Sequence, residues 1–166
     1  MSLEELNKLP AAQALTLFRD CCAADAWAYP MVESRPYGSA EALHGTARAL
    51  WPNLHETDWL GAFEAHPKIG DIKSLKAKYA STEALASGEQ SGARVAPDEV
   101  LQRLKDGNDA YLDKFGFIFI VCATGKSAEQ MLALLEERLP HTREEELRIA
   151  AAEQAKITHI RLDKLL

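Results

Sequence analysis

The sequence predicts an all-α protein, a single-domain, compact helical bundle of about eight or more helices that spans residues 1–166. Three observations lead to this fold class. In most segments apolar residues recur three or four positions apart, as they do on one face of a helix. Capping residues precede these segments, and proline or glycine ends them. Only one run, FGFIFIVCA at 115–123, looks extended, and one short run cannot form a sheet.

Four helices are expected before residue 67. The first begins after Ser2, which has a glutamate three positions later in the spacing of a capping box. The third covers 39–51, and the fourth covers 57–66 with Thr57 as its N-cap. A proline directly follows each of these two segments and cannot continue the helix. The second helix has an apolar face made up of Ala11, Leu15, Phe18 and Cys22.

Two helices are expected in the middle of the chain. The first covers 71–80, with Asp71 as its N-cap. The second covers 98–115 and ends at Gly116, a residue that favours helix ends. Its apolar stripe is interrupted by one amide and consists of Val100, Leu104, Asn108, Tyr111 and Phe115.

The last two helices have clear start signals. Ser127, with a glutamine three positions later, caps the segment 127–139, and a proline follows that segment. Thr142, with a glutamate three positions later, caps the final segment, 143–166. No internal repeat or low-complexity linker divides the chain, so we expect one domain.

Composition and charge narrow the classes of function. Apolar residues make up 47% of the chain and charged residues 27%, as is ordinary for a soluble globular protein. The net charge is -6 and no basic cluster compensates it, so binding to nucleic acid or an anionic membrane is not expected. No apolar run approaches the roughly 20 residues of a membrane-spanning helix. The first residues lack the pattern of a signal peptide, so we expect a cytoplasmic protein.

The cysteines are expected to be free and buried. Cys21 and Cys22 are adjacent and cannot easily bridge each other, Cys122 is the third, and no C-x-x-C is present. Free thiols fit a reducing cytoplasm. A Cys–His nucleophile is an alternative, but all three cysteines lie in apolar stretches, which favours inert side chains.

The segment FEAHPKIGD at 63–71 contains the first candidate for chemistry. His66 stands directly before Pro67, which ends the preceding helix and restrains the direction of the histidine. A histidine exchanges protons near neutral pH and is therefore a candidate acid or base. The alternative is that His66 is simply the last residue of a helix.

The spacing of the histidines does not predict a metal site. His44, His55 and His66 are each 11 residues apart, which would align them on one continuous helix. Gly45 and two prolines interrupt the segment, so the three histidines do not share a helix. We therefore expect no bound metal.

Polar side chains interrupt the apolar face of the last helix. Arg161 and Gln154 fall on that face, and arginine is rarely buried without a partner. Arg161 therefore either reaches the surface, pairs with a carboxylate, or points into a ligand pocket. The segments 86–94 and 108–127 are also distinctive, although the pattern alone favours a solvated loop and a buried connector. The face itself consists of Leu147, Ala150, Ala151, Ile157, Leu162 and Leu165.

Four motifs in order make the chain recognisable. HPKIGD at 66–71, EQSGA at 89–93, NDAYLDKFGF at 108–117 and EQAKITHIRL at 153–162 span most of its length. With these motifs the chain resembles the 2-oxo-4-hydroxy-4-carboxy-5-ureidoimidazoline (OHCU) decarboxylases of urate degradation. The resemblance implies an all-helical homodimer that converts OHCU into (S)-allantoin and carbon dioxide without a metal or an organic cofactor.

The resemblance also implies the residues of the site. The catalytic residues would be His66, Glu89 and Arg161. Three departures from the family pattern bear on the site. Ala86 stands where a serine is common, with a serine one position later, Ile118 replaces a proline in the loop that lines the pocket, and Gln154 stands where an aliphatic residue is common. The implied substrate-binding residues are Pro67, Ser87, Gln90, Phe117, Phe119, Ile120 and Val121.

The chemistry explains why such a protein needs no cofactor. OHCU has a carbon that bears both a hydroxyl and a carboxylate, next to a carbon doubly bonded to nitrogen. This C=N group accepts the electron pair that carbon dioxide leaves behind, so the substrate supplies its own electron sink. Two alternatives stay open, a non-catalytic dimeric binding module of the same fold and a decarboxylase of a related ureido-imidazoline. The presence of His66, Glu89 and Arg161 favours an enzyme.

Overall fold

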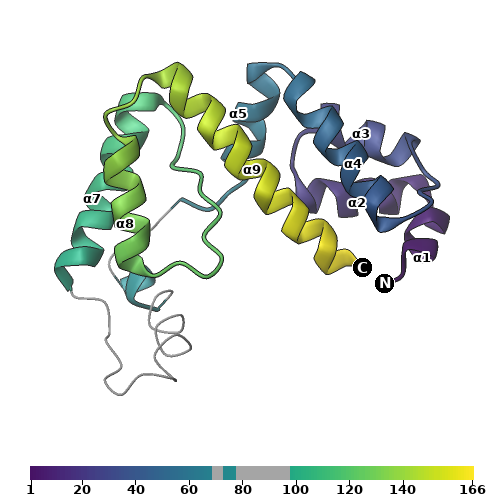
Figure 1. The fold of residues 1–166 in the computed structure, drawn as a ribbon, viewed down its shortest axis with the longest axis horizontal. Helices are drawn as coiled ribbons and strands as arrows, with labels where there is room; N and C mark the ends of the chain where they lie inside the picture. Colours follow the sequence, from purple (N-terminus) through teal and green to yellow (C-terminus); the bar gives the residue numbers. More distant parts are fainter. Residues whose placement is uncertain (69–72, 78–97) are drawn as a thin grey trace. The chain divides into compact units, whose positions relative to one another are not determined.

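The computed structural model describes residues 1–68, 73–77 and 98–166, and all regular elements in these ranges are helices (Figure 1). The all-α prediction is therefore confirmed. Within the same ranges no helix is long and apolar enough to cross a membrane. The contacts divide the chain into two compact units, which are described in turn. The prediction of a single domain stays a prediction.

The first unit contains Met1–His66 and Ile149–Leu166, and the second contains Pro67–Arg148. The first unit holds α1 (Leu3–Lys8), α2 (Ala11–Cys21), α3 (Asp25–Glu33), α4 (Ala40–Leu50), η1 (Trp51–Asn53), α5 (Glu56–Glu64) and most of α9 (Arg143–Leu165). The second holds helical residues 73–77, α7 (Asp98–Phe115), α8 (Ala128–Arg138) and the start of α9.

Two tryptophans connect the helices of the first unit. The indole N–H of Trp27 on α3 donates to the carbonyl of Ala47 on α4 at 3.3 Å. The indole N–H of Trp51 donates to the carbonyl of Ala151 on α9 at 2.8 Å. Both rings are almost fully buried, so each combines a large apolar contact with a satisfied donor. The core of this unit therefore fixes α9 against the N-terminal helices.

The sequence did not predict α3. Pro30 lies inside this helix, where proline removes a backbone donor and normally argues against helical structure. Tertiary packing outweighs that preference, because Trp27, Ala28 and Met31 on one side of α3 are buried in the core. Burial of such side chains contributes about 1.5–3 kcal/mol each for the larger ones, comparable to the cost of an internal proline.

The predicted start of the fourth helix was wrong. The N-cap of α5 is His55 rather than Thr57, which lies inside the helix. The carboxylate of Asp58 accepts a hydrogen bond from the His55 backbone N–H at 3.1 Å, so the first turn forms two residues earlier than a threonine cap would allow. The other caps are confirmed where they are described, at Ser2, Ser127 and Thr142. Asp71, the expected cap of the segment 71–80, lies outside the described residues.

In the second unit α7 packs closely against α8 (Figure 1). Helix α7 has the bounds expected from the sequence, and Gly116 after it has a φ of 79°, a conformation that glycine adopts without strain. The chain then runs without regular structure to the cap of α8. The ring of Tyr111 on α7 contacts the ring of Phe115 on the same helix and those of Phe117 and Phe119 in this segment.

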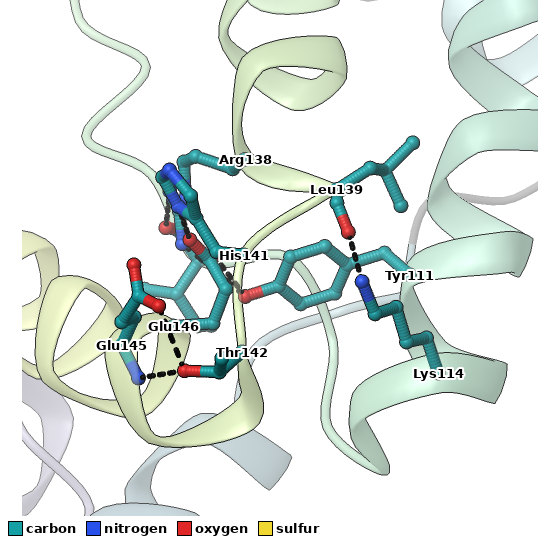
Figure 2. A network of polar contacts seen from close by, with 9 residues as sticks. Tyr111, Lys114, Arg138, Leu139, His141, Thr142, Glu145 and Glu146 are labelled. Carbon is teal, nitrogen blue, oxygen red and sulfur yellow. Dashed lines mark hydrogen bonds and ion pairs between the residues drawn. The ribbon is translucent and has the colours of Figure 1, made fainter.

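A buried ion pair holds the segment between α7 and α8 in place (Figure 2). Arg138 donates to the Glu146 carboxylate at 2.7 Å and to the carbonyl of Ile120, also at 2.7 Å. Glu146 is fully buried and also accepts from Tyr111 at 2.6 Å, while His141 lies 2.8 Å from its second oxygen. Several hydrogen bonds thus compensate the desolvation of both charges.

Candidate functional site

His66 lies just beyond the end of α5, in the first unit. Its backbone N–H donates to the carbonyl of Phe63 at 3.1 Å, and Pro67 follows, so both sides of the residue are restrained. The imidazole is half-buried. Its Nε2 lies 2.5 Å from the amide oxygen of Gln154 on α9. The sequence predicts a restrained backbone at His66, and the structure adds a specific contact between its imidazole and Gln154.

A chain of hydrogen bonds sets the orientation of Gln154. Its amide nitrogen donates to the hydroxyl of Thr158 at 3.1 Å, and that hydroxyl donates to the carbonyl of Cys21 at 3.5 Å. The amide oxygen of Gln154 consequently faces His66. Because this oxygen only accepts, Nε2 of His66 carries a proton, and Nδ1 is the basic nitrogen of the neutral ring.

The side chains of His66, Gln154 and Arg161 line a common cleft of about 410 Å³. Arg161 is half-buried and donates to the carbonyl of Cys21 at 3.3 Å. Among the described residues no carboxylate forms an ion pair with it, whereas Arg19 at the same cleft is paired with Asp25. The guanidinium of Arg161 is therefore a candidate ligand donor. The complete lining is Arg19, Asp20, Ala23, Ala62, Ala65, His66, Gln154 and Arg161.

Burial lowers the pKa of His66 below its ordinary value, because the charged imidazolium loses water. The hydrogen bond to Gln154 opposes this effect and raises the pKa, while the positive charge of Arg161 lowers it further. The net direction is downward. His66 is therefore neutral at neutral pH and able to accept a proton through Nδ1.

The neighbouring thiols are not nucleophiles at neutral pH. Burial raises the pKa of Cys21 to about 11 and that of Cys22 to about 12. Both thiols therefore stay protonated, and the thiolate is the reactive form. Cys122 is also buried and outside any disulfide, so the expectation of buried cysteines without disulfide bonds is confirmed. Cys21 contributes its backbone carbonyl, which accepts hydrogen bonds from Thr158 and Arg161.

The sequence model described as OHCU decarboxylase matches residues 7–163. The chain belongs to this family. The family match covers nearly the whole chain, in agreement with the four motifs that extend from HPKIGD to EQAKITHIRL.

Similar curated proteins have names that refer to uric acid degradation or to OHCU decarboxylation. A uric acid degradation bifunctional protein of Arabidopsis thaliana, TTL, is 41% identical over 146 residues, or 87% of this chain. A 2-oxo-4-hydroxy-4-carboxy-5-ureidoimidazoline decarboxylase of Haloferax volcanii is 25% identical over 98% of the chain and 94% of its own length. The bifunctional relatives are longer. This chain spans 45% of the Arabidopsis protein and 32% of one from Bacillus sp. (strain TB-90).

Solved structures resemble the fold. A crystal structure of OHCU decarboxylase in the presence of (S)-allantoin superposes with a TM-score of 0.71 at 40% identity, covering 89% of this chain and 95% of that one. An (S)-allantoin synthase has a TM-score of 0.74 at 22% identity, covering 99% of this chain and 53% of that one. The second match bears on the fold alone.

The structure describes only some of the family residues expected at the site. His66 and Arg161 line one cleft. Glu89, Ser87 and Gln90 lie outside the described residues. Pro67 and the segment 117–121 belong to the second unit, in which the side chains of Phe117, Phe119 and Ile120 are buried and Val121 is half-buried.

Sequence reasoning did not find the contact between His66 and Gln154. It placed Gln154 on the apolar face of the last helix without a partner, whereas Gln154 is the partner of His66 among the described residues. One signal was available. Gln154 and Thr158 lie one turn apart on the buried face of α9, and buried amides and hydroxyls need hydrogen-bond partners.

Proposed function

We propose that the protein is a carboxy-lyase of urate degradation, which removes carbon dioxide from OHCU and forms (S)-allantoin without a metal ion or an organic cofactor. Membership of the family supports the proposal. The observation that carries it is His66, which lies at a polar cleft with Nε2 held by Gln154 and Nδ1 left as the base.

The reaction requires cleavage of one C–C bond and three proton movements: nitrogen gains a proton, the hydroxyl oxygen loses one and carbon gains one, so the carboxylate substrate takes up one proton net from solvent. The bond to the carboxylate breaks, and its electron pair forms a double bond toward the ureido-bearing carbon while the C=N pair moves to nitrogen, which takes up a proton. The hydroxyl then loses its proton and becomes the carbonyl of allantoin. A proton adds to one face of the ureido-bearing carbon. That last step sets the handedness of the product.

His66 is suited to the proton movements. Its neutral Nδ1 accepts the hydroxyl proton, and the imidazolium so formed can return a proton to carbon. The hydrogen bond from Nε2 to Gln154 stabilises this imidazolium, since the amide oxygen accepts more strongly from a charged donor. The restrained position before Pro67 fixes the direction from which the proton arrives.

Arg161 is suited to binding rather than proton transfer. Its planar guanidinium matches the ring and ureido carbonyls of the substrate. A tight pair with the departing carboxylate would stabilise the ground state more than the transition state, so we assign the contact to the carbonyl groups. Its hydrogen bond to the Cys21 carbonyl fixes one edge of the guanidinium and leaves further donors for a ligand.

The homodimer implied by the family and the cytoplasmic location belong to the same proposal. Mass measurement in solution tests the first, and cell fractionation tests the second. A dimer is expected at the concentrations used for the turnover assays.

His66→Asn tests the assignment most directly. OHCU is generated from urate with the upstream enzymes, and the optical activity of the allantoin is followed. Unassisted decay gives racemic product, so we expect His66→Asn to form no excess of one enantiomer while keeping the helical content of the parent. The matched control is His55→Asn, an exposed histidine of the same unit. Near-native turnover by a folded His66→Asn variant would refute the proposal.

Arg161→Gln and Arg161→Lys test the second role. Both are expected to fold almost normally, because no described carboxylate depends on Arg161, and both are expected to lose turnover. Thermal unfolding is measured with and without allantoin. The ligand should stabilise the parent and stabilise the variants much less. If Arg161→Gln unfolds at a sharply lower temperature, or gains as much from allantoin as the parent, the arginine has a structural role instead.

A further inference from the structure

A second polar cluster lies in the first unit, between α4 and the C-terminal end of α9. It consists of His44, His159 and Asp163, and it shares no residue with the His66 cleft. Nε2 of His44 lies 2.7 Å from one carboxylate oxygen of Asp163, and Nε2 of His159 lies 3.5 Å from the other. One carboxylate thus receives a histidine from each of two helices.

The positions of the three groups follow from the helices. His159 and Asp163 are four residues apart on α9, a spacing that places two side chains on the same face. His44 projects from α4 so that its ring lies 3.8 Å from that of His159, with 29° between the planes. His44 is buried, whereas the side chains of His159 and Asp163 are about half exposed. The cluster is therefore fixed on one side and open to solvent on the other.

The donor groups of this cluster suit a divalent transition ion. Zinc binds imidazole nitrogen and carboxylate oxygen at about 2.0–2.2 Å, so tetrahedral ligand atoms lie roughly 3.3–3.5 Å from one another. The three candidate ligand atoms already lie within 4.8 Å of one another. An ion has to lie in the plane of both imidazoles and replaces the 2.7 Å hydrogen bond between His44 and Asp163, so the partly exposed His159 and Asp163 must take other rotamers to ligate it, and solvent can supply a fourth ligand. Two imidazoles with one carboxylate favour zinc over magnesium or calcium, which prefer oxygen ligands.

The surroundings of His44 agree with ligation through Nε2. Its Nδ1 is buried and has no hydrogen-bond partner among the described residues. A cavity of about 20 Å³ lies beside the ring and is lined in part by Trp27 and Trp51. A proton on Nδ1 is what the neutral ring requires when Nε2 binds a metal.

We propose that His44, His159 and Asp163 form a zinc site that clamps the end of α9 to α4. The site is structural and takes no part in the decarboxylation proposed for the His66 cleft. Histidine spacing along the sequence did not reveal it, because His44 pairs with residues of α9 and not with His55 or His66.

The test is a titration of the full, metal-stripped protein with zinc chloride against a chromophoric chelator near neutral pH. We expect one zinc ion per chain and a rise in the melting temperature on binding. His159→Asn and Asp163→Asn, both partly exposed substitutions that should fold, are each expected to weaken zinc binding at least ~10-fold. Binding should also weaken in acid, because protons compete for the imidazoles.

His55→Asn is the matched control, because it removes an exposed histidine of the same unit outside the cluster. It should bind zinc like the parent. Cobalt provides a second readout, since ligation by nitrogen in a low-coordinate site gives visible absorption that Asp163→Asn should lose. If the parent and Asp163→Asn bind zinc equally, or the parent binds none, the cluster is a plain hydrogen-bonded group and the proposal fails.

Discussion

The contact between His66 and Gln154 decides which imidazole nitrogen is available for chemistry. An amide oxygen at Nε2 keeps the proton there, and the hydroxyl of Thr158 keeps the amide from turning over. An aliphatic residue at position 154, which is common in the family pattern, would leave the tautomer unset by this helix. In this chain a buried amide therefore takes part in setting the tautomer of His66.

Gln154→Leu is expected to move the acid limb of the pH–rate profile to lower pH. In the proposed mechanism His66 acts as a base when it is neutral, so activity should fall as pH decreases through its pKa. The hydrogen bond from Gln154 raises that pKa, and its loss lets burial and Arg161 lower the pKa further. The measurements are kcat/KM against pH and the ¹⁵N shifts of the His66 ring, which report tautomer and titration directly.

Gln154→Glu provides the opposite change. A carboxylate at the same position stabilises the imidazolium, so the pKa of His66 should rise and the acid limb should move to higher pH. If both variants keep the profile and ring shifts of the parent, Gln154 does not control the histidine. The ring shifts are independent of turnover, so this outcome can be read even in a protein that does not act on OHCU.

At the scale of helices, local signals explain most of what the sequence predicts. The bounds of α7 and the cap of α8 follow from neighbouring residues, since Gly116 ends one helix and Ser127 begins the next. Helix α3 could not be predicted this way, because its internal Pro30 is tolerated only through burial of other residues. Gln154 and His66 are 88 positions apart, and no local rule links an amide to a histidine at that distance.

Alanine substitutions at two helical glycines should have opposite effects on stability, because only one of these glycines lies where two helices approach closely. A Cβ at Gly107 would lie 2.6 Å from the side chain of Leu135, which is fully buried on α8. Gly107→Ala should therefore destabilise the protein by about 1–3 kcal/mol despite the better helix propensity of alanine. Gly61 on α5 has nothing within 4 Å of its would-be Cβ, and Gly61→Ala should stabilise by up to about 1 kcal/mol. Urea unfolding distinguishes the two, and equal effects would contradict the packing.

The buried ion pair of the second unit should matter far more than an exposed one. Arg138→Met leaves the fully buried carboxylate of Glu146 without its cation, which should cost about 3–5 kcal/mol of unfolding free energy. The matched control is Arg103→Met, which removes an exposed pair with Glu136 and should cost at most about 1 kcal/mol. Comparable losses in urea unfolding would show that the network around Glu146 does not depend on the charge of Arg138.

At the scale of the whole molecule, α9 is the element that the two units share. This helix has 23 residues and begins at Arg143. Its first residues, including Glu146, belong to the second unit, and the rest, including Gln154 and Arg161, belong to the first. Unfolding of either unit removes packing from part of α9, and helix formation is cooperative along the chain. We therefore expect the two units to unfold together, as the prediction of a single domain requires.

The tryptophans allow this expectation to be tested. Trp27, Trp51 and Trp59 all lie in the first unit, so their fluorescence reports that unit, whereas far-ultraviolet circular dichroism reports helices of both. The two signals should give one coincident urea transition. Arg138→Met lies in the second unit and should move the fluorescence midpoint as far as the dichroism midpoint. If it shifts only part of the dichroism and leaves the fluorescence transition at its parental position, the chain contains two independent domains.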